Sequence, residues 1–427
     1  MDEATVNALV SDALHMSPRL TESLSSIIYR KTDGNGLFVV QFLKSLCDEG
    51  LLTFSLLSKQ WVWDVDAIVS RDMADDVVGL MTMKMLKLDT NALCGLKIAS
   101  CLGSQSDEST IKYLGSEYEG RGIGLSPMLD VAVNEGLMFK VGTTYNFAHD
   151  DIQKAAYCMI PEAERKYGHL QIGRELCSRV PPYQLETVLF IAVDQLFRGA
   201  DVMTSRDELI HLAHLALRAG DAAIAASAFL PSSLYLLQAV GLLEESDWIH
   251  HYDLTLQLYS SAAEACFVLG KFHVLSQISR KVIQNAVCLK DKIRVYVSLI
   301  RSISSQGRMC DAIDIGLSVL EQFGETLPSN LDDDEVITDY VVHTSALLAQ
   351  VDAEEVLKKE MAQDESKKFV VQLLGNLILP SFEGRRWLCP VISSRMVQLT
   401  LAHGIFRESA VAFALFGAVV SRSPEGI

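Results

Sequence analysis

Signals for secretion and membrane insertion are missing from this sequence. No Asn-x-Ser/Thr acceptor for N-glycosylation occurs, and no two of the nine cysteines form a Cys-x-x-Cys pair. The acidic opening Met1-Asp2-Glu3 is not followed by a long apolar stretch, so we expect no signal peptide. The longest apolar runs, such as residues 410–420, are too short to span a bilayer. We therefore expect a soluble, cytoplasmic chain outside membranes, with reduced and mostly buried thiols.

Basic residues are too few to balance the acidic ones. The 37 Lys and Arg against 54 Asp and Glu give a net charge of −17. That charge repels nucleic-acid phosphates and anionic lipid, and no stretch of the chain clusters Lys and Arg. We therefore expect neither nucleic acid nor a membrane surface as a partner. Hydrophobic residues make up 49% of the 427 residues, which is enough for two to four domains with real cores at roughly 150 residues per domain.

The phosphate-binding loop of NTP-hydrolysing enzymes, GxxxxGK[ST], is also absent. The nearest glycine-rich stretches, residues 33–36 and 120–124, have no Lys-Ser/Thr pair opening a helix. His211 and His214 lie at i and i+3, but no thiol or carboxylate completes a metal-binding motif around them. No nucleophile and base stand in a recognisable arrangement. We therefore expect no metal and no catalytic centre in this chain.

A helix followed by a hairpin is predicted near the N-terminus. Apolar residues recur at i, i+3, i+4 and i+7 within residues 39–46, which gives one apolar helix face. Two extended segments then flank a polar turn at residues 58–60. Trp61 and Trp63 alternate on the second segment and share one side, as half-buried aromatic residues of a wing do. The pattern predicts a first winged-helix module within residues 1–68.

A second module of the same kind follows in residues 69–160. Helices are predicted at residues 77–88, 93–102 and 128–134, with a short helix opened by acidic residues between the second and third. Two extended segments within residues 137–147 are separated by a Gly-Thr-Thr turn, which predicts another hairpin.

The sequence His149-Asp150-Asp151 directly follows this hairpin. It could be an acid–base pair or part of a metal site. However, Ile152, Ala155 and Ala156 follow at helical spacing, so an aspartate near the start of a helix is explained by capping and by the helix dipole. The spacing favours a structural role.

From residue 161 to residue 427 nearly every segment has helical periodicity. Gly270 and Gly307 each interrupt two predicted helices and are 37 residues apart. Helix–turn–helix units of this length are typical of tetratricopeptide (TPR) repeats, whose period is about 34 residues. The predicted fold class is mainly α: winged-helix modules followed by a TPR-like α-solenoid.

Winged helices raise the hypothesis of DNA binding. The helices that would enter a groove are acidic on balance, which argues against it. Their polar residues are Lys44, Asp48 and Glu49 in the first module, and Asp130, Asn134 and Glu135 in the second.

A family resemblance extends over most of the chain. Residues 28–38 (IYRKTDGNGLF) resemble the lid region of STAND-type AAA+ NTPases, in particular the Orc1-like ATPase module of large signalling proteins with kinase or histidine-kinase domains. The resemblance is clearest at residues 147–157 (FAHDDIQKAAY). It continues at residues 61–64, 98–103, 134–137, 160–161, 169–173, 217–220, 254–263 and 316–328.

The resemblance implies a nucleotide-binding core N-terminal to residue 1 and effector domains beyond Ile427. ATP would be bound only with such a core, with Gly34, Asn35 and Gly36 near the nucleotide and His149 as a nucleotide sensor. Two residues depart from the family pattern: Gly36 stands where proline is usual, and Asp151 stands where arginine usually follows the His-Asp pair.

The leading hypothesis is a non-catalytic regulatory and protein-interaction segment of a signalling NTPase, which binds protein partners through its helical repeats. The alternatives are a degenerate ATP-binding protein, a winged-helix DNA binder, and an unrecognised hydrolase that uses His149 and Asp150.

Overall fold

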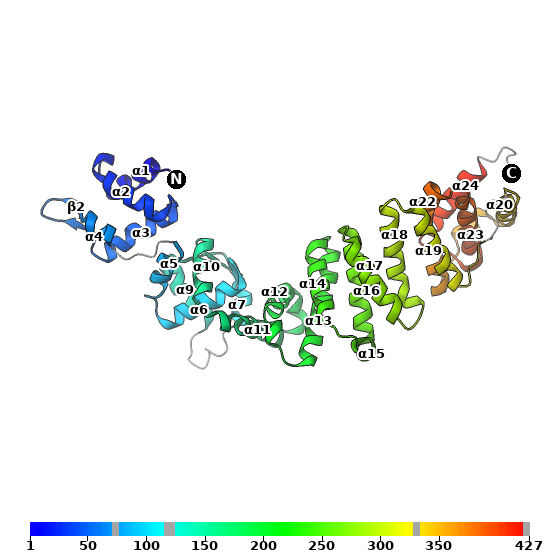
Figure 1. The fold of residues 1–427 in the computed structure, drawn as a ribbon, viewed down its shortest axis with the longest axis horizontal. Coiled ribbons are helices and arrows are strands. Elements are labelled where there is room, and N and C mark those ends of the chain that lie inside the picture. Colours follow the sequence, from blue (N-terminus) through cyan, green and yellow to red (C-terminus); the bar gives the residue numbers. More distant parts are fainter. Residues whose placement is uncertain (71–76, 115–123, 328–333, 422–427) are drawn as a thin grey trace. The chain divides into compact units, whose positions relative to one another are not determined.

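A computed structural model describes residues 1–70, 77–114, 124–327 and 334–421 (Figure 1). The chain is mainly helical and divides into two compact units, Met1–Ser205 (unit 1) and Arg206–Ile427 (unit 2). The mainly α fold predicted from the sequence is confirmed. Of the predicted loops, the glycine-rich stretch 120–124 lies outside the described residues except for Gly124.

Unit 1 combines short helices with two small antiparallel sheets. Its elements are α1 (Glu3–Leu14), α2 (Pro18–Thr32), α3 (Gly36–Asp48), β1 (Leu52–Ser55), β2 (Gln60–Trp63), α4 (Val65–Ser70), α5 (Val77–Met85), α6 (Thr90–Leu102), β3 (Gln105–Asp107), α7 (Glu108–Lys112), α9 (Leu125–Asn134), β4 (Met138–Val141), β5 (Thr144–Phe147), α10 (Asp150–Cys158), α11 (Glu162–Arg179), η1 (Pro182–Gln184), α12 (Leu185–Arg198) and η2 (Ala200–Val202).

The first hairpin lies where the sequence predicts it. Strands β1 and β2 pair antiparallel, with Leu52 opposite Trp63. Trp61 and Trp63 are half-buried against the core formed by α1 to α4, whereas Val62 between them is exposed. The alternation therefore places both indoles on the core side of the hairpin.

The second module contains one strand that the sequence does not predict. Strand β3 pairs with β5, which also pairs with β4, so the three-stranded sheet has the order β3-β5-β4. Asp107 closes β3 and caps α7, since its side chain accepts a hydrogen bond from the Ser109 amide at 2.8 Å. Helices α6 and α9 approach closely: a Cβ built on Gly95 would lie 2.8 Å from Cβ of Met128.

In the part of unit 2 that the structure describes, the elements are helices, with one isolated bridge between Met361 and Ile405. Its elements are α13 (Arg206–Ala225), α14 (Phe229–Leu242), α15 (Asp247–His250), α16 (Tyr252–Val268), α17 (Phe272–Asn285), η3 (Lys290–Lys292), α18 (Ile293–Ser305), α19 (Met309–Gln322), α20 (Asp334–Ala349), α21 (Ala353–Leu357), α22 (Glu365–Gly384), α23 (Leu388–His403) and α24 (Ser409–Val420).

Successive helices of unit 2 pack as pairs. Helix α13 packs on α14, α16 on α17, and α18 on α19, and neighbouring pairs meet through α14, α16 and α18 (Figure 1). Gly270 and Gly307 end the first helix of two of these pairs at φ +68° and +78°. In both turns the next residue donates its amide to a carbonyl five residues back, which is a motif that favours glycine. The predicted equivalence of the two glycines is confirmed.

The cysteines are free thiols, but the prediction that most are buried is wrong. Cys101 and Cys266 are buried, whereas Cys47, Cys158, Cys288 and Cys310 are exposed. Apolar neighbours at i±1 mislead here because adjacent residues of a helix point to different faces. Among the described helices, none combines the length and apolar character needed to cross a bilayer.

Candidate functional sites

The glycines expected near a nucleotide form the turn between α2 and α3. Gly34 adopts φ +69°, and its carbonyl accepts a hydrogen bond from the Met1 amino group at 2.7 Å. A Cβ built on Gly34 would lie 2.0 Å from the Met1 carbonyl oxygen, and one on Gly36 would lie 3.4 Å from Met1 Cε. The amide of Asn35 donates to Thr32. Met1 therefore packs directly against this turn.

His149 is the N-cap of α10. Its Nδ1 lies 3.2 Å from both the Asp151 amide nitrogen and an Asp151 carboxylate oxygen. The first contact needs Nδ1 without a proton and the second needs Nδ1 with one, so only one of the two can be a hydrogen bond at a time. The side chains of Asp150 and Asp151 lie in the first turn, beside the positive end of the helix, but the capping group is the histidine.

Helix α3 brings its own residues to His149. The ring of Phe38, two residues beyond Gly36, meets the His149 imidazole edge-on with centroids 5.4 Å apart. Phe38 belongs to the core of the second module, although Val39, Phe42, Leu43 and Leu46 of the same helix pack in the first. Lys84 strengthens the joint by donating to Gln41 of α3 at 2.7 Å, and burial lowers the pKa of its amine. The structure thus joins α3 to the start of α10.

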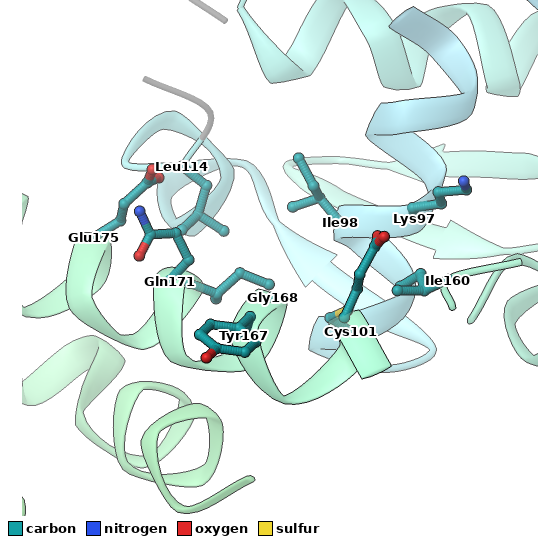
Figure 2. Close-up of a pocket in the computed structure, with 11 residues that line it drawn as sticks. Lys97, Ile98, Cys101, Leu114, Ile160, Tyr167, Gly168, Gln171 and Glu175 are labelled. Atoms are coloured by element: carbon teal, nitrogen blue, oxygen red, sulfur yellow. The ribbon is translucent and has the colours of Figure 1, made fainter. Parts of the chain in front are cut away.

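A cavity of about 530 Å³ lies between α6 and α11. Figure 2 shows the α6 residues on one side and the α11 residues on the other. Its walls are Ile98, Cys101, Leu114, Ile160 and Ile172, with Tyr167, Gly168 and Gln171 along α11, and its charged residues are Lys97, Glu164 and Glu175. This volume falls in the range of small-ligand pockets, which are mostly apolar with a few polar groups.

Cys101 places its thiol at the wall of the cavity. Burial raises the pKa of the Cys101 thiol to about 11, so the thiol stays protonated at neutral pH. Burial also lowers the pKa of His169, the buried histidine of α11, so its imidazole stays neutral. A neutral thiol and a neutral imidazole do not form the ion pair that activates a catalytic cysteine.

A buried chain of hydrogen bonds lies beside the cavity. The Tyr157 hydroxyl is 2.9 Å from His169 Nε2, and His169 Nδ1 is 2.6 Å from the side-chain oxygen of Gln195. The Gln195 amide then donates to the Cys101 carbonyl at 2.8 Å. A single assignment satisfies every bond: Nδ1 carries the proton and Nε2 accepts from tyrosine. Four helices, α10, α11, α12 and α6, are therefore connected by side chains that neither periodicity nor spacing identifies.

His211 and His214 of α13 are both exposed. Burial lowers the pKa of His214, and the nearby His211 and His251 lower it further. Within residues 1–70, 77–114, 124–327 and 334–421, no group of three His, Cys, Asp or Glu side chains is placed to hold a metal ion.

Comparison with known proteins gives one clear relative. The chain is 25% identical, over 512 aligned positions, to hybrid signal transduction histidine kinase G of Dictyostelium discoideum. The alignment covers 99% of this chain but only 14% of the relative's length. No family model matches the sequence.

A solved structure is also similar. It is the crystal structure of a STAND (signal transduction ATPase with numerous domains) protein with a tetratricopeptide repeat sensor from Pyrococcus horikoshii. The match covers 100% of this chain and 67% of the solved chain, with 13% identity and a TM-score of 0.32.

Proposed function

We propose that this chain is a non-catalytic regulatory and protein-interaction segment of a signalling NTPase. The observation that carries the proposal is the series of helix pairs in unit 2, which leaves large apolar side chains exposed. Examples are Leu230 and Leu234 of α14, Val268 of α16, and Leu379 and Phe382 of α22. Apolar side chains on the surface of a repeat array are typical of protein-binding surfaces.

The proposal assigns a role to unit 1 as well. The order α6-β3-α7-α9-β4-β5 is the order of elements in a winged helix, and we assign the hairpin β1-β2 with α3 to a first, smaller module. The three predicted domains, 1–68, 69–160 and 161–427, belong to this proposal, as does the finer likeness to Orc1-like ATPases. The contact between Phe38 and His149 would couple the lid-like helix α3 to the second module.

The similarity to a hybrid histidine kinase supports a place in signal transduction. Because the chain spans 14% of that relative, a nucleotide-binding core and an effector kinase would be supplied by other parts of a complete protein. ATP would then meet Gly34, Asn35, Gly36 and His149 only in the presence of such a core. A cytoplasmic location belongs to the same proposal.

The catalytic part of the proposal is tested with the purified chain and ATP. We expect phosphate release at the rate of buffer alone. ATP turnover that stays with the protein through successive columns would contradict the proposal. If that turnover fell in a His149→Ala, Asp150→Ala double variant, it would support the hydrolase alternative instead.

The binding part is tested by selecting a phage-displayed library of random peptides on the immobilised chain. We expect enrichment of peptides that bind unit 2. Failure to enrich any peptide over a blank surface would contradict the proposal.

DNA binding is the weaker alternative. Asp48 and Glu49 at the end of α3 and Asn134 and Glu135 at the end of α9 are all exposed, so the polar ends of both helices are acidic in the structure as in the sequence. We expect no binding to a 20-bp duplex at physiological salt. Salt-sensitive binding there would revive the alternative.

A further inference from the structure

A hollow also lies within unit 2, where α16, α18, α19 and α22 come together. It encloses about 570 Å³, and the residues that matter here are Phe267 of α16, Arg301 and Ser304 of α18, Met309 of α19, and Asn376 and Leu379 of α22. A neighbouring hollow of about 520 Å³ shares Gly307 and Met309 with it, so the two form one groove along the α18–α19 turn.

Arg301 is the charged residue of the first hollow. Its guanidinium lies over the ring of Phe267, 5.0 Å from the centroid, and no carboxylate lines this hollow. Glu408 approaches Gly375 of α22 but is not part of the lining. Three other arginines of unit 2 do have acidic partners: Arg294 pairs with Glu264 at 2.9 Å, Arg385 with Asp314 at 2.6 Å, and Arg395 with Glu325 at 2.6 Å. Among the described residues, Arg301 forms no such ion pair, although the chain carries a net charge of −17.

The surroundings of Arg301 offer further groups to a ligand. The side-chain amide of Asn376 donates a hydrogen bond to the Gln372 carbonyl at 2.8 Å. Its side-chain oxygen has no partner within the described part of the chain. Leu379 is 61% exposed although it lines the hollow. A cation held on an aromatic face, an amide acceptor and an apolar wall thus lie together. An isolated anion would use only the first of these groups.

We propose that this groove binds an extended peptide segment that places an Asp or Glu carboxylate on Arg301 and an apolar side chain on Leu379 and Met309. A planar guanidinium matches a carboxylate with two parallel hydrogen bonds, and the ring of Phe267 holds it in place. The peptide backbone can donate an amide to Asn376. The inference rests on the proposed function, since it names the place and the chemistry of protein binding by unit 2.

The charges of the second hollow determine at which end of the groove the acidic residue of the peptide lies. It contains Glu383, which is exposed, and Arg308, which is already paired with Asp311 at 2.6 Å. A second acidic residue at that end would face Glu383 and would be repelled. The acidic residue of the ligand therefore belongs at the Arg301 end alone, and a neutral or basic residue belongs at the Glu383 end.

The test uses the full chain and the random peptide library described above. We expect enriched peptides to combine one acidic residue with an apolar residue nearby. Arg301→Gln should weaken the best peptide by about tenfold or more, as expected for a charge-assisted pair. Arg301→Lys should recover part of the loss because it keeps the charge without the bidentate geometry. Leu379→Ser should weaken binding as well.

Matched controls lie elsewhere in unit 2. Arg280→Gln on α17 and Leu357→Ser on α21 change an exposed arginine and an exposed leucine outside the groove, and neither should alter affinity. If the parent chain binds the peptide and Arg301→Gln binds it with unchanged affinity, the proposed binding site in the groove is wrong. The proposed function would not be contradicted by that result. Enrichment of no peptide at all would overturn both.

Discussion

The two units of this chain form hollows of similar size by different means. The cavity of unit 1 lies between α6 and α11 and carries Lys97 together with two glutamates, and a buried chain of hydrogen bonds ties its walls together. The groove of unit 2 lies across three helix pairs, and its first hollow carries an arginine without an acidic neighbour in the lining. The walls of the unit 1 cavity are thus connected by hydrogen bonds, whereas the first hollow of unit 2 offers one arginine without an acidic partner.

The two units also differ in how far apart in the sequence the residues that stabilise them lie. Gln195 and Cys101, which share a buried bond in unit 1, are 94 residues apart in the sequence. Within residues 206–322 of unit 2, the ion pairs Lys281–Glu245 and Arg294–Glu264 span 36 and 30 residues, about one repeat, whereas Arg395–Glu325 in the last helices spans 70. A repeat array is stabilised mainly between neighbours, so a local change in unit 2 should stay local. A change in the buried network of unit 1 should affect the whole unit.

The largest effect is expected from Gln195→Leu. The variant leaves His169 Nδ1 and the Cys101 carbonyl buried without partners, which costs about 2–4 kcal/mol of unfolding free energy in unit 1. Urea unfolding followed by hydrogen exchange should show early exchange throughout α6, α10, α11 and α12, with unit 2 unchanged. Equal destabilisation of both units would contradict the contrast drawn above.

A smaller, pH-dependent effect is expected at Glu325 of unit 2. Burial alone would raise the pKa of this carboxyl, but hydrogen bonds from Lys367 and Arg395 outweigh burial and lower it below 4.5. A group with a lowered folded-state pKa stabilises the fold above its unfolded pKa, and that stability is lost as pH falls through the folded value. Unit 2 should therefore weaken as the pH falls below about 4.5.

The check on Glu325 is a melting curve at pH 7 and at pH 3.5. Glu325→Gln should melt earlier than the parent chain at pH 7, and the difference should narrow at pH 3.5, which is below the ordinary carboxyl pKa of 4.5, because the unfolded parent chain gains a proton there. A constant difference at both values would mean that the carboxylate charge does not contribute.

His149→Ala should have a modest effect. The variant removes the N-cap of α10 and the contact with Phe38. We expect it to lower the free energy of unfolding by about 1 kcal/mol. Differential scanning calorimetry should show the loss in unit 1. His149→Asn, which can still cap the helix, should restore most of it. Full stability in the alanine variant would show that the cap is dispensable.

The smallest effect is expected from Lys281→Ala. Its ion pair with Glu245 is exposed on both sides, and exposed pairs contribute little. We expect no measurable change in the melting of unit 2 at physiological salt, which makes this variant the control for Glu325→Gln. A clear loss would mean that unit 2 depends on surface ion pairs along its length.

Sequence patterns predicted the local structure well. The helix positions, the hairpins at Trp61 and Tyr145, and the equivalent turns at Gly270 and Gly307 follow from periodicity and turn chemistry. Strand β3 was missed because three polar residues, Gln105–Asp107, have no strand pattern of their own and pair only because β5 lies beside them. Local signals do not report such a partner.

The candidate functional sites were harder to predict from the sequence than the local structure. The resemblance to a known family drew attention to Gly34, Gly36 and His149, and the structure places Phe38 of the same helix against His149. The bonds from Tyr157 through His169 to Gln195 connect residues up to 38 positions apart on three helices, and Arg301 meets Phe267 across two helix pairs. Helical periodicity fixes which face a residue occupies but not which other helix that face will meet.

Hydrogen exchange of the full chain, with and without the peptide most enriched from the random library, tests the central claim most directly. Protein binding by unit 2 predicts protection of α16, α18 and α22, with exchange in α6 and α11 unchanged. Protection confined to α6 and α11, with none in unit 2, would contradict the claim and would move the interaction surface to the cavity of unit 1.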